Sequence, residues 1–288
     1  GAGIPGPANT LNGSNATSIW SVTGIDAGTL TVGGNILTFN DFANLNGAAG
    51  ADTFDLTATL TGNITGGDGA NDYNLNAAVN VGGGITGGTG DDTFDFNNNG
   101  ATVTGALDGG AGGINTLDYA GTSAGVTVTL TSLGTGNFGF AGTVPGTGGF
   151  DRMTSLVGST GTDTLIGRNS TATWTVNGGG TTYDSENILT FSLVENLTGG
   201  AAADIFSITG AHSGDISGAG GEDLFAVNAA LAGSLNGDAD ADTINLGPSG
   251  SVSGILSGGS GGNDDSDAAT GTGGMDGGTP GDDAGSGG

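Results

Sequence analysis

The stretch at residues 87–96, GGTGDDTFDF, constrains the fold most strongly, because the chain repeats it with variation. Its glycines suit a tight turn, since glycine adopts positive φ values at little cost. An acidic residue follows the turn, and alternation along the chain then places Phe94 and Phe96 on one face of a short strand. The unit is one turn followed by one strand, and its recurrence predicts a stack of such units.

The shorter of two nested repeats is a coil of about twenty residues with two strands. The first large apolar residue of each coil in the first half of the chain is separated from the next by 19, 21 and 23 residues, at Phe54, Tyr73, Phe94 and Leu117. Stacked coils about 4.8 Å apart satisfy one another's backbone hydrogen bonds without a large side-chain core. The spacing therefore predicts an all-β chain, a right-handed parallel β-helix (β-solenoid) with these side chains in one interior file.

The longer repeat has a period of about 150 residues. Residues 36–39, ILTF, recur as residues 188–191 at an offset of 152, and Trp20 recurs as Trp174 at an offset of 154. Near residue 260 the positions expected to be apolar become polar or small. The sequence thus predicts two tandem solenoid units and a Gly/Asp-rich tail or assembly segment, at residues 1–163, 164–260 and 261–288 respectively.

The charge of the chain is strongly one-sided, with 29 acidic residues, no lysine and two arginines, for a net charge of −27. Nucleic acid and anionic membrane surfaces need the opposite sign, so neither is an expected partner. The apolar runs are too short to cross a bilayer, so we expect no membrane insertion. Divalent cations are the natural counter-partners. The absence of cysteine excludes disulfides and thiolate metal sites.

Stacking would also align the polar residues that follow each turn. These are Asp52, Asn71, Asp92 and Asn115 in the first unit, and Asp204, Asp223 and Asp242 in the second. Two carboxylates about 4.8 Å apart repel by roughly 0.9 kcal/mol even at the permittivity of bulk water. Such a file is tolerable if some groups are protonated, if asparagines alternate with the acids, or if cations intervene. Among cations, Ca²⁺ suits carboxylate and carbonyl oxygens best.

The whole chain resembles bacterial secreted proteins with RTX-like repeats, a family that includes giant surface adhesins. Residues 87–92, GGTGDD, match the family's motif in full, and residues 66–71, GGDGAN, match it nearly. Residues 47–52 and 199–204 have lost glycines. The resemblance implies Ca²⁺ bound by glycine-turn carbonyls and turn side chains of successive coils, with Gly87, Gly88, Gly90, Asp92, Asp52, Asn71, Asp204, Asp223 and Asp242 as candidate ligands.

Catalytic residues are scarce. His212 is the only histidine and lies in a Gly-rich segment, where we expect a solvated surface role. A polysaccharide lyase or hydrolase would use basic side chains, and the chain has only Arg152 and Arg168. The sequence therefore predicts that the protein is not an enzyme.

A Gly-rich insert between Leu133 and Arg152 interrupts the short repeat. We expect a loop or irregular coil on the flank of the solenoid. Exposed phenylalanines would make it a contact patch, because such side chains are costly unless covered. The candidates are Phe138, Phe140 and Phe150.

The leading hypothesis is an extracellular or cell-surface structural protein, a secreted fibre, matrix filament or adhesin stalk. Copies would associate head to tail into a homopolymer, since contacts that do not close produce filaments. The alternative is a calcium-responsive RTX-type module of a larger secreted protein. Chelation separates the two, because such a module should lose β-structure without Ca²⁺. A polysaccharide-cleaving enzyme would instead show turnover on an acidic glycan.

Overall fold

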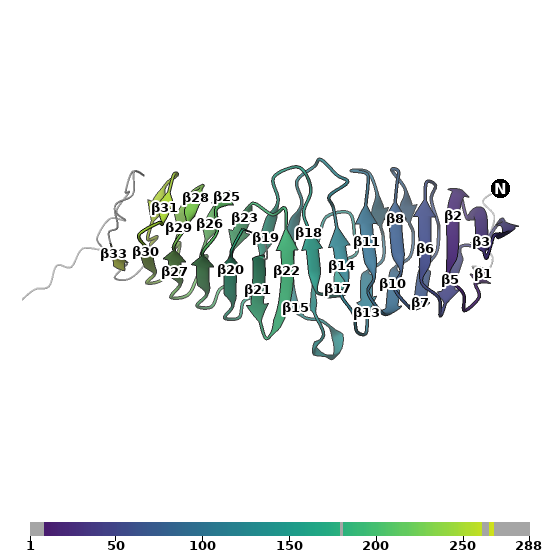
Figure 1. Cartoon of the computed structure of the whole chain (residues 1–288), viewed down its shortest axis with the longest axis horizontal. Helices are drawn as coiled ribbons and strands as arrows, with labels where there is room; N and C mark the ends of the chain where they lie inside the picture. Colours follow the sequence, from purple (N-terminus) through teal and green to yellow (C-terminus); the bar gives the residue numbers. More distant parts are fainter. Residues whose placement is uncertain (1–8, 179–180, 261–264, 268–288) are drawn as a thin grey trace, which may run out of the picture. The chain divides into compact units, whose positions relative to one another are not determined.

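A computed structural model describes residues 9–178, 181–260 and 265–267 of the chain. The chain forms two compact units, Gly1–Thr162 (unit 1) and Asp163–Gly288 (unit 2). In each unit, strands from successive coils lie side by side as a stack (Figure 1). The helical structure among the described residues is one 3₁₀ turn, η1 (Thr135–Asn137). The prediction of an all-β parallel β-solenoid is confirmed.

Unit 1 has two long faces and one short face. In spatial order, the first face contains β1 (Thr10–Asn12), β5 (Asn44–Ala48), β7 (Ile64–Asp68), β10 (Ile85–Thr89), β13 (Leu107–Gly110), β17 (Phe150–Met153), β16 (Phe140–Thr143) and β15 (Thr127–Leu133). The second contains β4 (Asn35–Phe39), β3 (Ala27–Val32), β2 (Ser18–Gly24), β6 (Asp52–Leu56), β8 (Asp72–Leu75), β11 (Thr93–Phe96), β14 (Thr116–Asp118) and β18 (Ser155–Val157). The short face pairs β9 (Asn80–Val81) with β12 (Thr102–Val103).

Unit 2 repeats this arrangement. Its first face contains β19 (Thr164–Ile166), β23 (Asn196–Thr198), β26 (Ile216–Ser217), β29 (Leu235–Asn236) and β32 (Leu256–Ser257). Its second face contains β22 (Asn187–Ser192), β21 (Thr181–Ser185), β20 (Thr173–Val176), β24 (Ile205–Ile208), β27 (Leu224–Val227), β30 (Thr243–Leu246) and β33 (Asp265–Asp267). The short face contains β25 (His212–Ser213), β28 (Ala230–Ala232) and β31 (Ser251–Val252).

The predicted interior file is present. Parallel pairing places Phe54 beside Tyr73, Tyr73 beside Phe94, and Phe94 beside Leu117. The rings stack nearly face to face, with centroids 5.2 Å apart for Phe54 and Tyr73 and 5.0 Å apart for Tyr73 and Phe94. These distances are close to the spacing of neighbouring strands, so the coil repeat sets the ring spacing. All four side chains are buried.

The long sequence repeat corresponds to a structural repeat. Trp20 pairs with Phe54 in unit 1, and Trp174 pairs with Phe206 in unit 2. In both units the strand that carries the tryptophan leads into an antiparallel meander, β2–β3–β4 or β20–β21–β22. The recurring ILTF sequence is the outer strand of this meander. The repeat is visible in the sequence, but its antiparallel geometry is not.

The coils also have one more strand than the sequence predicted. The expected second strand at residues 103–110 divides into β12 and β13, with Gly105 at the corner between them. A Cβ at Gly105 would lie 2.5 Å from the backbone nitrogen of Gly84 in the preceding coil. The corner therefore needs glycine because the backbones approach too closely for a side chain.

The insert differs from the predicted loop. Its strands β15, β16 and β17 form an antiparallel meander within the first face. Phe140 and Phe150 are buried, at 0% and 5% exposure, and Phe138 is half-buried. The expectation of an exposed phenylalanine patch was wrong, because the meander turns two of these rings into the core.

The stacked file generates a stability prediction. We expect Phe94→Ala to destabilise unit 1 by about 3 to 5 kcal/mol, because the substitution opens a cavity between two stacked neighbours. Chemical denaturation followed by circular dichroism would measure the loss. Thr93→Ala is the matched control, since Thr93 is next in the strand but only half-buried, and should cost about 0.5 kcal/mol. Equal losses for the two variants would contradict the assignment of Phe94 to the core.

Candidate functional site: the aspartate and asparagine ladder

The polar turn residues predicted from the sequence form a buried file, here called the ladder. Each member precedes the large apolar residue of its coil by two positions, as Asp52 precedes Phe54. Their exposed fractions lie between 0% and 2%, for Asp52, Asn71, Asp92 and Asn115 in unit 1 and Asp204, Asp223 and Asp242 in unit 2. The prediction that these residues align is thus confirmed within each unit, but their side chains face the interior.

In unit 1, the first three ladder side chains each accept a hydrogen bond from the backbone one coil earlier, whereas Oδ1 of Asn115 is buried without a hydrogen-bond partner among the described residues. The N–H of Ser18 donates to Asp52 Oδ1 at 2.8 Å. The N–H of Asp52 donates to Asn71 Oδ1, and the N–H of Asn71 donates to Asp92 Oδ1, both at 3.0 Å. The ladder therefore satisfies buried backbone donors at the turn, where the strand ladders do not reach.

Unit 2 repeats the same geometry with aspartates throughout. The N–H of Ala172 donates to Asp204 Oδ1, and that of Asp204 donates to Asp223 Oδ1, both at 2.7 Å. The N–H of Asp223 donates to Asp242 Oδ1 at 2.9 Å. Unit 1 alternates carboxylate and amide, whereas unit 2 stacks three carboxylates in succession.

The second carboxylate oxygen is less well satisfied than the first. Among the described residues, Oδ2 of Asp52, Asp92 and Asp223 is buried without a hydrogen-bond partner. Asp204 differs, because the N–H of Gly200 donates to its Oδ2 at 2.8 Å. An unpaired buried carboxylate oxygen favours the protonated form of the group.

Burial accordingly raises the pKa of four ladder acids. It raises the pKa of Asp92 to about 6, against the hydrogen bonds from Asn71, which lower it. It raises the pKa of Asp223 to about 7, with the neighbouring charge of Asp242 adding to the effect. The pKa values of Asp52 and Asp204 are also raised by burial. Asp92 and Asp223 therefore take up protons near neutral pH.

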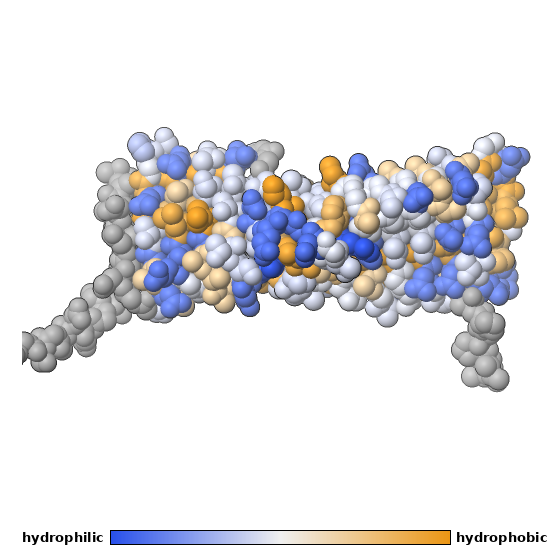
Figure 2. Space-filling view, turned by 90° about the horizontal axis from the view of Figure 1, so that it is seen from below, coloured by the Kyte–Doolittle hydropathy of each residue, from blue (hydrophilic) through white to orange (hydrophobic). Residues whose placement is uncertain are grey.

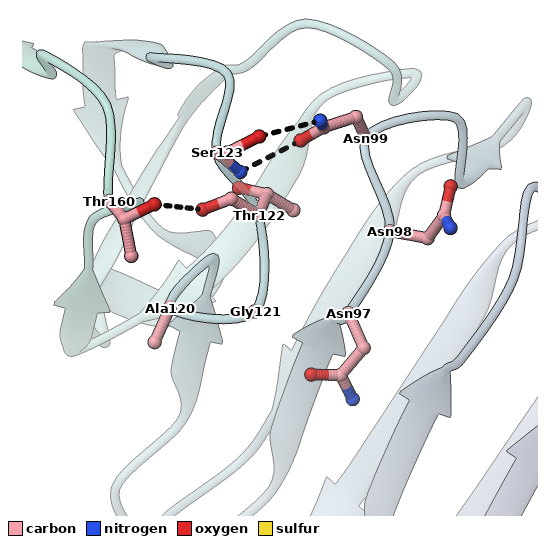
Figure 3. A pocket seen from close by; sticks show the side chains of 8 residues that line it. All are labelled: Asn97, Asn98, Asn99, Ala120, Gly121, Thr122, Ser123 and Thr160. Atoms are coloured by element: carbon pink, nitrogen blue, oxygen red, sulfur yellow. Dashed lines mark hydrogen bonds between the residues drawn. The ribbon is translucent and has the colours of Figure 1, made fainter.

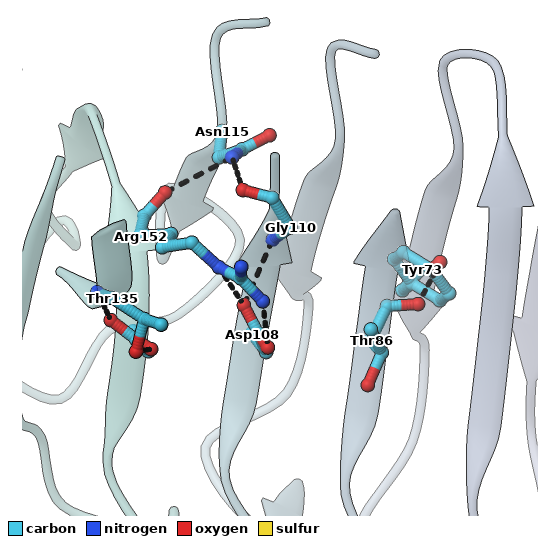
Figure 4. A network of polar contacts seen from close by, with 8 residues as sticks. Tyr73, Thr86, Asp108, Gly110, Asn115, Thr135 and Arg152 are labelled. Atoms are coloured by element: carbon cyan, nitrogen blue, oxygen red, sulfur yellow. Dashed lines mark hydrogen bonds and ion pairs between the residues drawn. The ribbon is translucent and has the colours of Figure 1, made fainter. Parts of the chain in front are cut away.

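Where asparagine replaces aspartate in the ladder, the cost of burying an ionised carboxylate disappears. Asn71 Nδ2 donates to the carbonyl of Gly69 at 3.1 Å and to Asp92 Oδ1 at 2.9 Å. Asn115 Nδ2 donates to the carbonyls of Gly110 and Arg152, at 3.4 and 3.0 Å (Figure 4). At Asn71 the amide thus keeps the acceptor that the ladder needs and gives its nitrogen partners as well, whereas at Asn115 only the nitrogen is satisfied.

A glycine lies five residues before every ladder member, and for most of them the structure shows why. A Cβ at Gly87 would lie 2.3 Å from Asp92 Oδ2, and one at Gly218 would lie 2.1 Å from Asp223 Oδ2. The first glycine of the motif therefore makes room for the ladder side chain.

Two further motif glycines serve the turn itself. Gly88 and Gly90 have φ values of +126° and +129°, which L side chains rarely adopt. Their Cβ positions would also collide with the carbonyl oxygens of Gly67 and Gly69 in the previous coil. The glycines of the candidate metal set therefore have a steric role in this fold.

The predicted calcium ligands are thus brought together in each unit. Their Oδ1 atoms, however, accept hydrogen bonds from the backbone, whereas the prediction had them bind an ion. Each Oδ1 points at a backbone N–H group, and Ca²⁺ requires six to eight oxygen ligands. No cluster of three or more His, Asp or Glu side chains suited to a metal occurs in the described part of the chain. The ladder offers an ion few oxygens, and calcium binding stays a prediction.

Sequence reasoning missed the residues that end the ladder. Ser18 donates its hydroxyl to Asp52 Oδ1 at 2.6 Å, and Thr154 Oγ1 accepts the N–H of Asn115 at 2.9 Å. Both precede the large apolar residue of their strand by two positions, before Trp20 and Leu156. This spacing was the signal that could have identified them.

One arginine stabilises the region beside the ladder. The Arg152 guanidinium contacts both carboxylate oxygens of Asp108, with Nε donating to Oδ1 at 2.7 Å (Figure 4). Its backbone has a φ of +59°, in the left-handed region, and its carbonyl accepts from Asn115. Arg152 thus joins the insert to the coil before it, and it is not free to bind an acidic substrate.

His212 lies in a strand, whereas the sequence predicted a solvated position in a Gly-rich segment. It lies in strand β25, is half-buried, and has its Nε2 2.7 Å from the carbonyl oxygen of Glu195. Burial lowers its pKa, so the imidazole is neutral at neutral pH. The surroundings describe a structural histidine.

A shallow polar pocket lies on the flank of unit 1 (Figure 3). Asn99 spans it, donating to Ser123 Oγ at 3.0 Å and accepting the N–H of Ser123 at 2.9 Å. The Thr160 hydroxyl donates to the carbonyl of Thr122 at 3.1 Å. The pocket is lined by amide and hydroxyl groups, most of which hold neighbouring loops together.

Comparisons with known proteins gave no relative. A scan against models of protein families found no match, and searches of curated proteins and of solved structures found none either. The described residues contain no helix long and apolar enough to cross a membrane. The resemblance to RTX-like proteins therefore depends on the repeat motif and stays a prediction.

The raised pKa of Asp223 predicts a pH effect on stability. The usual pKa of aspartate is near 3.9, so this carboxyl stabilises the fold fully below about pH 4 and loses that contribution as the pH rises through 7. Asp223→Asn keeps an acceptor for the N–H of Asp204 and carries no charge. We expect it to raise the melting temperature at pH 8 by about 2 to 4 °C or more, and by clearly less at pH 5, where the wild-type carboxyl has lost only part of its contribution.

Thermal melts of the full chain between pH 5 and 8 would test this. The control is Asp184→Asn, which makes the same charge change at an exposed residue and should leave the pH profile unchanged. An Asp223→Asn variant that melts at or below the wild-type temperature at pH 8 would show that the ladder tolerates its charges.

The glycine spacing predicts a second pair of variants. We expect Gly218→Ala to destabilise unit 2 by about 1 to 3 kcal/mol, because its Cβ would collide with Asp223 Oδ2. Gly220→Ala is the control from the same turn, where the nearest atom to an added Cβ is 3.8 Å away. We expect it to change stability by no more than about 0.5 kcal/mol. Similar melting temperatures for the two variants would contradict the steric role of Gly218.

Proposed function

We propose that this protein is an extracellular structural protein, a β-solenoid fibre, matrix filament or adhesin stalk. The observation that carries the proposal is how the ladder uses its carboxylates. Asp52, Asp204 and Asp223 bind backbone N–H groups of the preceding coil. The buried carboxylates of the repeat therefore hold one coil to the next, which suits a stack that bears mechanical load.

The few basic side chains support the same role. Arg152 pairs with Asp108, and Arg168 donates to the carbonyl of Ser185 at 3.0 Å. The two arginine side chains are only 21% and 11% exposed. Because the chain has no lysine, proteases that cleave after basic residues find few accessible sites. Such resistance suits a protein exposed outside the cell.

A calcium-responsive module of a larger secreted protein is the second candidate. The observation that favours it is the unpaired, buried Oδ2 of Asp92, within the full motif at residues 87–92. A bound cation would give that oxygen a partner. Against it, Asp92 Oδ1 is already engaged by both nitrogens of Asn71.

Electron microscopy and circular dichroism of the full chain, in millimolar Ca²⁺ and again in EGTA, would test the proposal. We expect elongated particles and unchanged β-structure under both conditions, because backbone and ladder hydrogen bonds hold the coils together. Millimolar Mg²⁺ is the control for ionic effects. Particles that unravel in EGTA and regain β-structure with Ca²⁺ but not with Mg²⁺ would overturn the proposal in favour of the calcium-responsive module.

A further inference from the structure

The N-terminal end of unit 1 exposes two strand edges, which we call the open edge: β1 (Thr10–Asn12) and β4 (Asn35–Phe39). Strand β1 pairs with β5, and β4 pairs with β3. Among the described residues of unit 1, neither strand has a partner on its other side. Unpaired edges of this kind can accept a further strand from another chain.

The core is also open at this end. Register places Trp20 opposite Leu30 and Leu30 opposite Leu37, so all three lie on the inward face of the meander. Their exposed fractions rise from 0% to 6% to 51% along this row. On the opposite face of β4, Ile36 is 69% exposed. Figure 2 shows apolar residues gathered at this end of unit 1.

The direction of β4 suits continued stacking. Strand β3 is antiparallel to β2, and β4 is antiparallel to β3, so β4 runs in the same direction as β2. Because β2 is parallel to β6, β4 is also parallel to the coil strands of its face. Strand β1 is likewise parallel to β5. Both edges can therefore be extended by parallel strands, as in the rest of the stack.

The meander is not a device for blocking the end. Protected edges commonly carry charged residues or proline, and β4 has neither. The meander also recurs at the start of unit 2 as β20–β21–β22, where its outer strand repeats the ILTF sequence. It is part of the repeat itself.

The last described coils of unit 2 are open in a complementary way. Leu246 and Leu256 are half-buried, whereas their partners in the preceding coil, Val227 and Leu235, are 0% exposed. The backbone of β33 continues the parallel register of β30. This end thus presents half-buried core positions and coil strands that are parallel to one another.

We infer that the open edge of unit 1 binds the C-terminal coils of unit 2 from a second copy of this chain. The inference rests on the proposed structural function and adds its partner and surface. The two surfaces differ, so the contact is head to tail and does not close, which produces filaments. Each copy carries a charge of −27, and assembly should strengthen with salt, which screens the repulsion.

Leu37→Glu in the full chain tests the surface. Leu37 is half exposed, and the variant should keep the wild-type circular dichroism spectrum. In analytical ultracentrifugation at 0.15 and 0.5 M NaCl, we expect the wild type to form species that grow with concentration and salt. We expect Leu37→Glu to weaken association at least tenfold. The control is Ile114→Glu, which adds the same charge at an isoleucine that is 60% exposed in an inner coil, and it should associate like the wild type.

A mixing experiment tests the polarity. A Leu37→Glu molecule keeps its C-terminal surface, so in equimolar mixture it should end wild-type filaments and shorten them in electron micrographs. Unchanged filament length in the mixture, or wild-type species that stop at dimers, would overturn the head-to-tail contact. A wild type that is monomeric at all concentrations and salts would overturn the docking inference. If those monomers remain elongated in EGTA, the proposed structural function still stands.

Discussion

The structure depends on a hydrogen bond that crosses from a turn to the one before it, at six of the seven ladder positions. In a stack of short strands the turns are the weak points, because their backbone N–H groups lie beyond the strand ladders and are buried. The side chain of Asp52, Asn71 or Asp223 supplies the missing acceptor. This requirement explains why the repeat places a short polar residue two positions before its large apolar residue. It also explains the glycine five positions earlier, whose hydrogen leaves room for that side chain.

The choice between aspartate and asparagine then sets the electrostatic cost of each unit. An amide satisfies the same donor and directs its second group to a carbonyl, as Asn71 does with Gly69. A carboxylate leaves one buried oxygen without a partner, and burial then makes ionisation of the group costly, as at Asp223. Unit 1 alternates the two, whereas unit 2 stacks Asp204, Asp223 and Asp242 in succession. The two units share one backbone arrangement, but their stabilities should depend differently on pH.

The coil length, the aromatic file and the alignment of the ladder could be predicted, because each follows from spacing along the chain. The direction of the carboxylates could not. A Gly-rich turn that ends in Asp92 has the same sequence whether its oxygens face an ion or a backbone N–H group. The burial of Phe140 was also unpredictable, since its meander depends on antiparallel pairing between segments with no repeat signal. Residue spacing determines the register of the strands, but the direction in which polar side chains point depends on tertiary structure.

A stack held together in this way has no intrinsic length, because every coil presents to the next the surface that it received from the last. Shape alone does not limit growth at an edge such as β4, which lacks the charges and prolines that usually protect edge strands. In the proposed assembly, the long-range charge of the chain would take that role. A net charge of −27 with no lysine would keep copies apart at low ionic strength, and salt would shorten the range of that repulsion to within about 8 Å at 0.15 M. In this proposal the acidic composition controls when such stacks can meet, while the hydrogen-bonded ladder holds the coils of each unit together.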